Sequence, residues 1–209
     1  MKSLTQLLLL PYLATLSAAS PLLTRQTAPS EPAQLQSFSA SGTGCPSGSF
    51  TTDITEDGTV ITYGFTINQA EVGLGAPSSS RERYCDITLR YQFPVGCTTA
   101  QFKSTYHGYV QLDSGVTGTF NSQYSLSPGS LTNGSPGAVT VTSAAYGGAG
   151  NPFLKDDVAG ARVTVNSASQ RTVTFTLRNR LLVQANSQSV SGFMDESDVT
   201  VALINQAVC

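Results

Sequence analysis

The chain has 209 residues and a mass of 21.9 kDa, with 11 Lys and Arg, 13 Asp and Glu, one His and no Trp. Charged residues make up 11% of the chain, roughly half the usual share, and Ser and Thr fill about a quarter of all positions. This length allows one domain. The near-neutral charge argues against a nucleic-acid-binding protein, which needs a basic surface. The single His excludes a metal site built from several histidines.

The N-terminus has the pattern of a secretory signal peptide. Lys2 supplies one positive charge, an apolar run extends over Leu7–Leu16, and small residues follow. The apolar run is too short to span a bilayer, which needs about 20 residues. We predict a signal peptide over residues 1–19, cut after Ala19, with Ser20 as the alternative cleavage site. The protein is therefore expected to be extracellular, with no membrane span.

Residues 20–43 are rich in Ser, Ala, Gln and Pro and show no hydrophobic periodicity. We predict that this segment is a flexible leader, in which Arg25 offers a processing site. The remainder, residues 44–209, is expected to form a single domain.

The four cysteines all lie in that domain: Cys45, Cys85, Cys97 and Cys209. An even number of cysteines in a secreted protein indicates disulfides rather than metal or redox chemistry. Four cysteines allow three pairings. We favour Cys45–Cys85, which attaches the start of the domain to an inner strand, and Cys97–Cys209, which holds down the last residue.

Apolar and polar residues alternate along most of the domain with the two-residue period of β-strands. Over residues 85–93 the odd positions are apolar, so Cys85 is expected to face the core. Over residues 102–112 the same alternation turns His107 and Tyr109 outward. The segments expected to form strands are 49–55, 59–67, 85–93, 102–112, 116–126, 138–143, 162–166, 172–185 and 198–205.

No segment beyond the leader combines a 3.6-residue period with capping residues, so helices are not expected. Strands separated by Gly, Pro and Asn turns predict an all-β fold, an antiparallel β-sandwich of about eight to ten strands tied by disulfides. A barrel is the alternative. Thr and Val suit pleated sheet surfaces, so the low charge content is interpreted as a property of the strand surfaces.

His107 is the only imidazole that could act as a general base. A catalytic triad also needs a nucleophile and an orienting acid within hydrogen-bond reach. No G-x-S-x-G sequence occurs in the chain. We therefore interpret His107 as a solvent-facing strand residue.

The acidic residues offer two further hypotheses. Asp195, Glu196 and Asp198 could supply oxygens to Ca²⁺, but no calcium-loop sequence supports this, and a solvated hairpin is the favoured interpretation. Glu71 and Asp113 could form a glycosidase pair, although the sequence does not distinguish them from surface acids. We predict no metal and no cofactor.

Two surface features complete the candidate sites. Tyr109 is the best tyrosine for stacking against a sugar ring, although the absence of Trp weakens the case for carbohydrate binding. Asn133-Gly134-Ser135 is an N-glycosylation sequon, in which the following Pro136 lowers the expected occupancy.

Several short motifs stand out in the first half of the domain. These are Gly44–Pro46, Ala70–Gly75, Ser80–Arg81 and the sequence HGYVQLDSGVTG at His107–Gly118. Together they resemble the secreted fungal proteins of domain-of-unknown-function family 4360. The resemblance covers residues 44–126. It implies a secreted, disulfide-bearing, β-rich fold and implies no reaction, because the family has no established activity.

The sequence departs from the family pattern in ways that bear on function. Leu74 stands where Pro is usual. His107 stands where Arg is usual, and a required general base would not be exchanged for Arg.

Three functions from different classes follow. We favour a secreted, monomeric, non-enzymatic protein that acts through its surface on a cell-wall polysaccharide or a host surface component. The second is a carbohydrate-binding module, and the third is a small secreted hydrolase that uses His107 or an acid pair. The candidate ligand contacts are Glu71, Arg81, His107, Tyr109 and Asp113.

Overall fold

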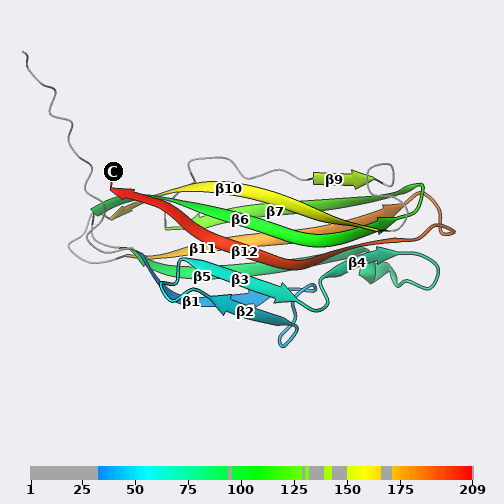
Figure 1. The fold of residues 1–209 in the computed structure, drawn as a ribbon, viewed down its shortest axis with the longest axis horizontal. Coiled ribbons are helices and arrows are strands. Elements are labelled where there is room, and N and C mark those ends of the chain that lie inside the picture. Colours follow the sequence, from blue (N-terminus) through cyan, green and yellow to red (C-terminus); the bar gives the residue numbers. More distant parts are fainter. Residues whose placement is uncertain are drawn as a thin grey trace, which may run out of the picture.

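The protein is a β-sandwich in a computed structural model that describes residues 33–93, 96–128, 130–131, 139–142, 150–165 and 171–208. Two sheets pack face to face along the long axis of the molecule (Figure 1). Among the described residues the only helix is η1, a single 3₁₀ turn over Ser78–Arg81. The predicted all-β antiparallel sandwich is confirmed.

The described residues form twelve strands. They are β1 (Gln34–Ser41), β2 (Phe50–Ile54), β3 (Val60–Phe65), β4 (Gln69–Val72), β5 (Glu82–Phe93), β6 (Gly96–Leu112), β7 (Val116–Ser127), β8 (Ser130–Leu131), β9 (Val139–Thr142), β10 (Asn151–Val165), β11 (Arg171–Ala185) and β12 (Gly192–Val208).

The strands divide into two antiparallel sheets. The five-stranded sheet has the order β1-β5-β11-β7-β9. The seven-stranded sheet has the order β2-β3-β12-β6-β10-β8, and β4 pairs with the first residues of β12. Because β4 and β6 flank the same part of β12, three strands lie side by side at one end of the molecule.

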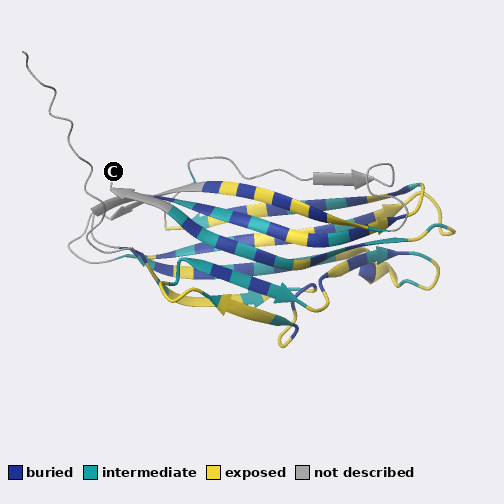
Figure 2. Ribbon diagram, viewed as in Figure 1, coloured by how far each residue is buried: buried dark blue, intermediate teal, exposed yellow. Residues whose placement is uncertain are grey.

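The alternation expected from the sequence is visible along each long strand, where buried and exposed residues follow one another (Figure 2). The inward residues of both sheets form one apolar core. Phe102 of β6 and Phe175 of β11 stack across the interior, with ring centroids 3.9 Å apart. Burying such rings removes large apolar areas from water, which is the main force that holds the two sheets together.

The disulfide Cys45–Cys85 forms as predicted, with both cysteines fully buried. It attaches the loop before β2 to the inner face of β5. The side chains of Cys97 and Cys209 lie outside the described residues, as do the sequon at Asn133 and all of residues 1–32.

The prediction of a flexible leader through residue 43 is wrong for its last part. Residues Gln34–Ser41 form β1, which pairs antiparallel with β5 and contains a register shift between Leu35 and Ser37. Strand β1 is mostly exposed and polar because it lies at a sheet edge, so it carries little of the hydrophobic alternation that marks a strand in a sequence.

Other segments expected to be loops are also strands, which raises the number above the eight to ten expected. Residues Gln69–Val72 form β4, and β10 begins at Asn151. The hairpin expected near Asp195 is instead the first half of β12. There, Glu196 pairs with Gly108 and Asp198 with His107, so Ser197 is an extra bulged residue.

Candidate functional site

Four of the five predicted contact residues lie at the end of the sandwich that carries β4. This end also carries the turn between β6 and β7 and the hairpin between β11 and β12. Glu71 and Asp113 line a shallow hollow of about 190 Å³. Arg81 lines a neighbouring cleft that shares Val72 with this hollow. Tyr109 lies beside the hollow, because its ring stacks against Phe193.

The hollow lies on the outer face of the seven-stranded sheet, where Phe193 of β12 is in register with Glu71 of β4 and Gln111 of β6. Residues paired across antiparallel strands point to the same face, so these three side chains are neighbours. Phe193 is therefore a site residue that was not predicted from the sequence. The acidic residues that follow it indicated a solvated hairpin, so the strand alternation that includes Phe193 was not recognised.

Tyr109 and Phe193 form an aromatic pair beside the hollow. Their ring centroids are 6.0 Å apart and their planes differ by 25°. On the other side of Tyr109, the exposed Pro152 of β10 is in register with it. We call Tyr109, Phe193 and Pro152 the aromatic platform. A hydrogen bond holds the backbone of the platform at Tyr109, because the Tyr109 backbone N–H donates to Asp195 Oδ1 at 2.7 Å.

Asp113 is held in place by the hairpin between β11 and β12. Its Oδ2 accepts 2.8 Å hydrogen bonds from the backbone N–H and the hydroxyl of Ser191. These bonds favour the charged form and lower the pKa of Asp113 below its usual value. The carboxylate therefore contributes a fixed, ionised acceptor at the rim of the hollow.

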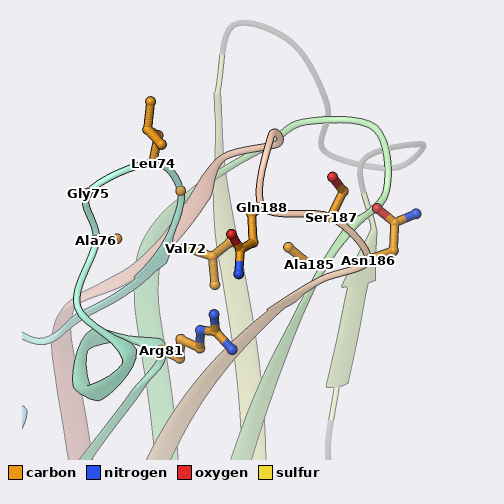
Figure 3. Close-up of a pocket in the computed structure, with 10 residues that line it drawn as sticks. Val72, Leu74, Gly75, Ala76, Arg81, Ala185, Asn186, Ser187 and Gln188 are labelled. Carbon is orange, nitrogen blue, oxygen red and sulfur yellow. The ribbon is translucent and has the colours of Figure 1, made fainter.

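The neighbouring cleft has a volume of about 520 Å³ and is shown in Figure 3. The side chains of Arg81 and Gln188 point toward one another across it, whereas Leu74 points away from it at the tip of its loop. Leu74 is 98% exposed. The loop residues Gly73 and Gly75 have φ angles of +153° and +87°, which allow the chain to turn sharply here.

His107 does not join this group. Its Nδ1 lies 2.7 Å from Asp198 Oδ1 on the outer face of the same sheet, and its side chain is 51% exposed. No described Ser, Thr or Cys side chain hydrogen-bonds to the ring. Among the described residues, Asp198 and His107 thus form an acid–imidazole pair, but no nucleophile completes a catalytic triad with them.

Glu196 was predicted to lie on a solvated hairpin, and this is wrong. Its side chain is buried between the sheets, where it accepts hydrogen bonds from Asn68 Nδ2 at 2.7 Å and Asn179 Nδ2 at 2.6 Å. Burial, and secondarily the charge of Asp198, raise the pKa of Glu196 well above its usual value.

A second buried polar cluster joins β7 to β10. Lys155 Nζ forms an ion pair with Asp157 and donates a 2.7 Å hydrogen bond to Ser122 Oγ. The hydroxyl of Tyr124 donates to Asp157 at 3.0 Å. Lys155 and Asp157 are each only 7% exposed, so both charges are paired inside the sandwich and do not offer a surface to a ligand.

The Domain of unknown function (DUF4360) family model matches residues 31–208. The chain belongs to this family. The match includes β1, in agreement with the strand found within the expected leader.

One curated relative of this DUF4360 protein is described as an uncharacterized secreted protein of Arthroderma benhamiae, 31% identical over 86 residues. That alignment covers 41% of this chain and 35% of the relative. Among solved structures, a complex of TmCBM61 with beta-1,4-galactotriose aligns with 82% of this chain and 90% of its own, at 9% identity and a TM-score of 0.24.

The motifs that carried the family resemblance have structural roles in this DUF4360 protein. Gly44 lies against Asn68, because an added Cβ would be 2.0 Å from Asn68 Oδ1. At Gly108 an added Cβ would be 2.3 Å from the Phe153 ring. Gly44 and Gly108 therefore allow the close packing of the sandwich at these two positions.

The described part of the DUF4360 chain contains no cluster of three or more His, Cys, Asp or Glu side chains suited to a metal ion. Nor does any helix within it have the length and apolar character needed to cross a membrane.

Proposed function

We propose that this DUF4360 protein is a secreted, non-catalytic protein that binds extracellular polysaccharide through the aromatic platform and the adjoining hollow. The observation that carries the proposal is the Tyr109–Phe193 ring pair on the outer face of the seven-stranded sheet. Both rings are partly exposed. Partly exposed aromatic rings present an apolar surface with a fixed orientation, to which the C–H face of a sugar ring can stack.

The hollow supplies the polar half of such a site. Glu71, Gln111 and Asp113 surround Phe193 with hydrogen-bond acceptors and donors. Small-molecule sites combine apolar contact with a few oriented polar groups, and this arrangement has both. The nearby cleft adds the guanidinium of Arg81, which makes no ion pair with another described residue.

In the described residues no Ser, Thr or Cys side chain hydrogen-bonds to His107, which favours binding over hydrolysis by this histidine. His107 is paired with Asp198, and the buried Lys155, Asp157 and Glu196 are enclosed by the two sheets. The secreted relative and the predicted signal peptide support an extracellular location, such as the cell wall or a host surface.

The test is retention of the full-length mature protein on insoluble chitin, β-glucan and cellulose. We expect retention on at least one of them. Replacing the rings in Tyr109→Leu and Phe193→Leu should reduce the retained fraction at least fivefold, because the leucine side chain keeps apolar volume but has no ring face.

The matched control is Val158→Ala, on the outer face of the same sheet and 44% exposed. It should behave as the wild type. The proposal is wrong if none of the three polysaccharides retains the protein, or if both ring variants are retained as well as the control.

A further inference from the structure

A second polar groove lies on the outer face of the five-stranded sheet, on β5, β11 and β7. The pairing of these strands arranges its side chains in rows. The three rows are Tyr84–Arg180–Asn121, Asp86–Arg178–Gln123 and Thr88–Thr176–Ser125. Two hollows, of about 390 and 470 Å³, share Gln123 and Arg178, and we call the two together the outer groove.

The charges in the outer groove are paired and held in fixed positions. Arg178 donates to both oxygens of Asp86 at 2.6 Å, and Arg180 donates to both oxygens of Glu82 at 2.8 and 2.9 Å. The Arg178 guanidinium also lies 5.4 Å from the centre of the Tyr84 ring. The groove therefore carries rigid planar groups and no net charge from these pairs.

Much of its hydrogen-bonding capacity is still open to a ligand. Each guanidinium has five N–H donors and uses two of them on its carboxylate. The amides of Asn121 and Gln123 make no hydrogen bond to another described residue, and both side chains face solvent at least in part. Rows of oriented donors and acceptors, on a surface whose charges are paired with one another, suit a ligand that is elongated, uncharged and rich in hydroxyl groups.

We propose that the outer groove is a second polysaccharide-binding site, weaker than the aromatic platform, so that one molecule holds two glycan strands on opposite faces of the sandwich. The proposal rests on the proposed function for its first site. The groove favours a glycan over a nucleic acid, because its guanidinium charges are already neutralised and a polyphosphate would gain little from them.

The experiment measures bridging separately from binding. Particles of chitin, β-glucan or cellulose that retain the full-length mature protein are washed and offered a fluorescently labelled soluble form of the same polysaccharide. Wild-type protein should capture the soluble chain on the particles. The variant Asn121→Ala/Gln123→Ala keeps both ion pairs, so it should remain folded, as checked by its melting temperature.

We expect this double variant to retain at least half of the wild-type binding to particles. The amount of labelled soluble polysaccharide that it captures should fall at least fivefold. The platform variant Tyr109→Leu should also lose capture, because either site alone cannot hold two chains. The matched control is Thr172→Ala, exposed on the outer face of β11 beyond the groove, and it should capture as the wild type does.

The outcomes separate the two proposals. Capture by the double variant at the wild-type level, or retention of wild-type protein without capture, overturns the second site and leaves the proposed function standing. Loss of all retention in the double variant, with normal retention in the ring variants, places binding in the outer groove and overturns the platform and the bridging. Absence of retention on every polysaccharide overturns both.

Discussion

Asn179 of β11 donates a 2.6 Å hydrogen bond to Glu196 of β12 and thereby links the two sheets through the interior of the sandwich. Asn68 completes the arrangement by donating to the other carboxyl oxygen. Because burial raises the pKa of Glu196 well above its usual value, the folded protein keeps this carboxyl protonated at pH values where the unfolded chain releases the proton.

This raised pKa predicts the sign of a pH dependence. The folded state binds more protons than the unfolded state between the usual pKa of 4.5 and the raised pKa, so the contribution of Glu196 to stability falls as the pH rises through that range. One proton sets the upper limit of this slope at about 1.4 kcal/mol per pH unit. Chemical denaturation from pH 4 to pH 8 measures it.

Glu196→Gln removes the titrating group and keeps the shape, so the free energy of unfolding of this variant should depend less steeply on pH than that of the wild type. The difference between the two isolates Glu196 from other titrating groups such as Asp195. Identical slopes for wild type and variant would show that the carboxyl does not hold its proton in the fold.

The Lys155–Asp157 pair should be sensitive to the loss of one partner. Lys155→Met leaves the Asp157 carboxylate buried and without its counter-charge, and we expect a loss of about 3–5 kcal/mol in the free energy of unfolding. The double variant Lys155→Met/Asp157→Leu should lose less than the single variant, because no unpaired charge remains.

The matched control for this pair is Lys103→Met, since Lys103 of β6 pairs with Asp156 of β10 at 3.3 Å on the outer face of the seven-stranded sheet. An exposed pair contributes about 0–1 kcal/mol. Equal effects of Lys155→Met and Lys103→Met in urea titrations would contradict the buried ion pair.

The long central strands could be predicted from sequence because one of their faces is apolar throughout. The inward positions of β6 from Ala100 to Leu112, among them Phe102, Tyr106 and Val110, are buried as expected, and His107 faces outward. The disulfide Cys45–Cys85 followed from the same alternation, which turned Cys85 toward the core.

Strand β1, the first part of β10 and the first half of β12 were not predicted as strands, for two physical reasons. Strand β1 lies at an edge and needs little apolar surface. The inward faces of β10 and the first half of β12 carry Lys155, Asp157 and Glu196. Lys155 and Asp157 pair with each other and with Ser122 of β7, and Glu196 accepts hydrogen bonds from Asn68 and from Asn179 of β11. A sequence does not show those partners, so Glu196 was expected to lie on a solvated hairpin, and the first part of β10 was not expected to be a strand.

The candidate site was predictable to the extent that it depends on strand parity. Tyr109 was expected outward, and Glu71, Arg81 and Asp113 were named as contacts, yet nothing in the sequence placed Phe193 beside Tyr109. That pairing depends on the register between β6 and β12, which is set by the bulge at Ser197.

The Cys45–Cys85 disulfide closes a loop with a sequence separation of 40 residues. In the chain-entropy model, a loop of this size stabilises the folded state by about 4 kcal/mol. Cys45→Ser/Cys85→Ser should lower the free energy of unfolding by about 2–5 kcal/mol, measured by denaturation without reductant. If the free energy of unfolding fell by less than about 1 kcal/mol, the disulfide would not stabilise the fold by restricting the unfolded chain.

His107→Arg tests the non-catalytic assignment of the only histidine. Arg can maintain the exposed pair with Asp198, so we expect the free energy of unfolding to change by less than about 0.5 kcal/mol. Retention on polysaccharide should also be unchanged. If the purified protein hydrolyses a polysaccharide and His107→Arg abolishes that hydrolysis, the assignment is wrong.

The most direct test of polysaccharide binding by the aromatic platform is an adsorption isotherm of the mature protein on the insoluble polysaccharide that retains it best. The double variant Tyr109→Leu/Phe193→Leu should bind at least tenfold more weakly than wild type while its melting temperature changes little, because it loses the two ring faces of the aromatic platform. Superimposable isotherms for the folded double variant and the wild type would contradict the proposal that this platform binds polysaccharide.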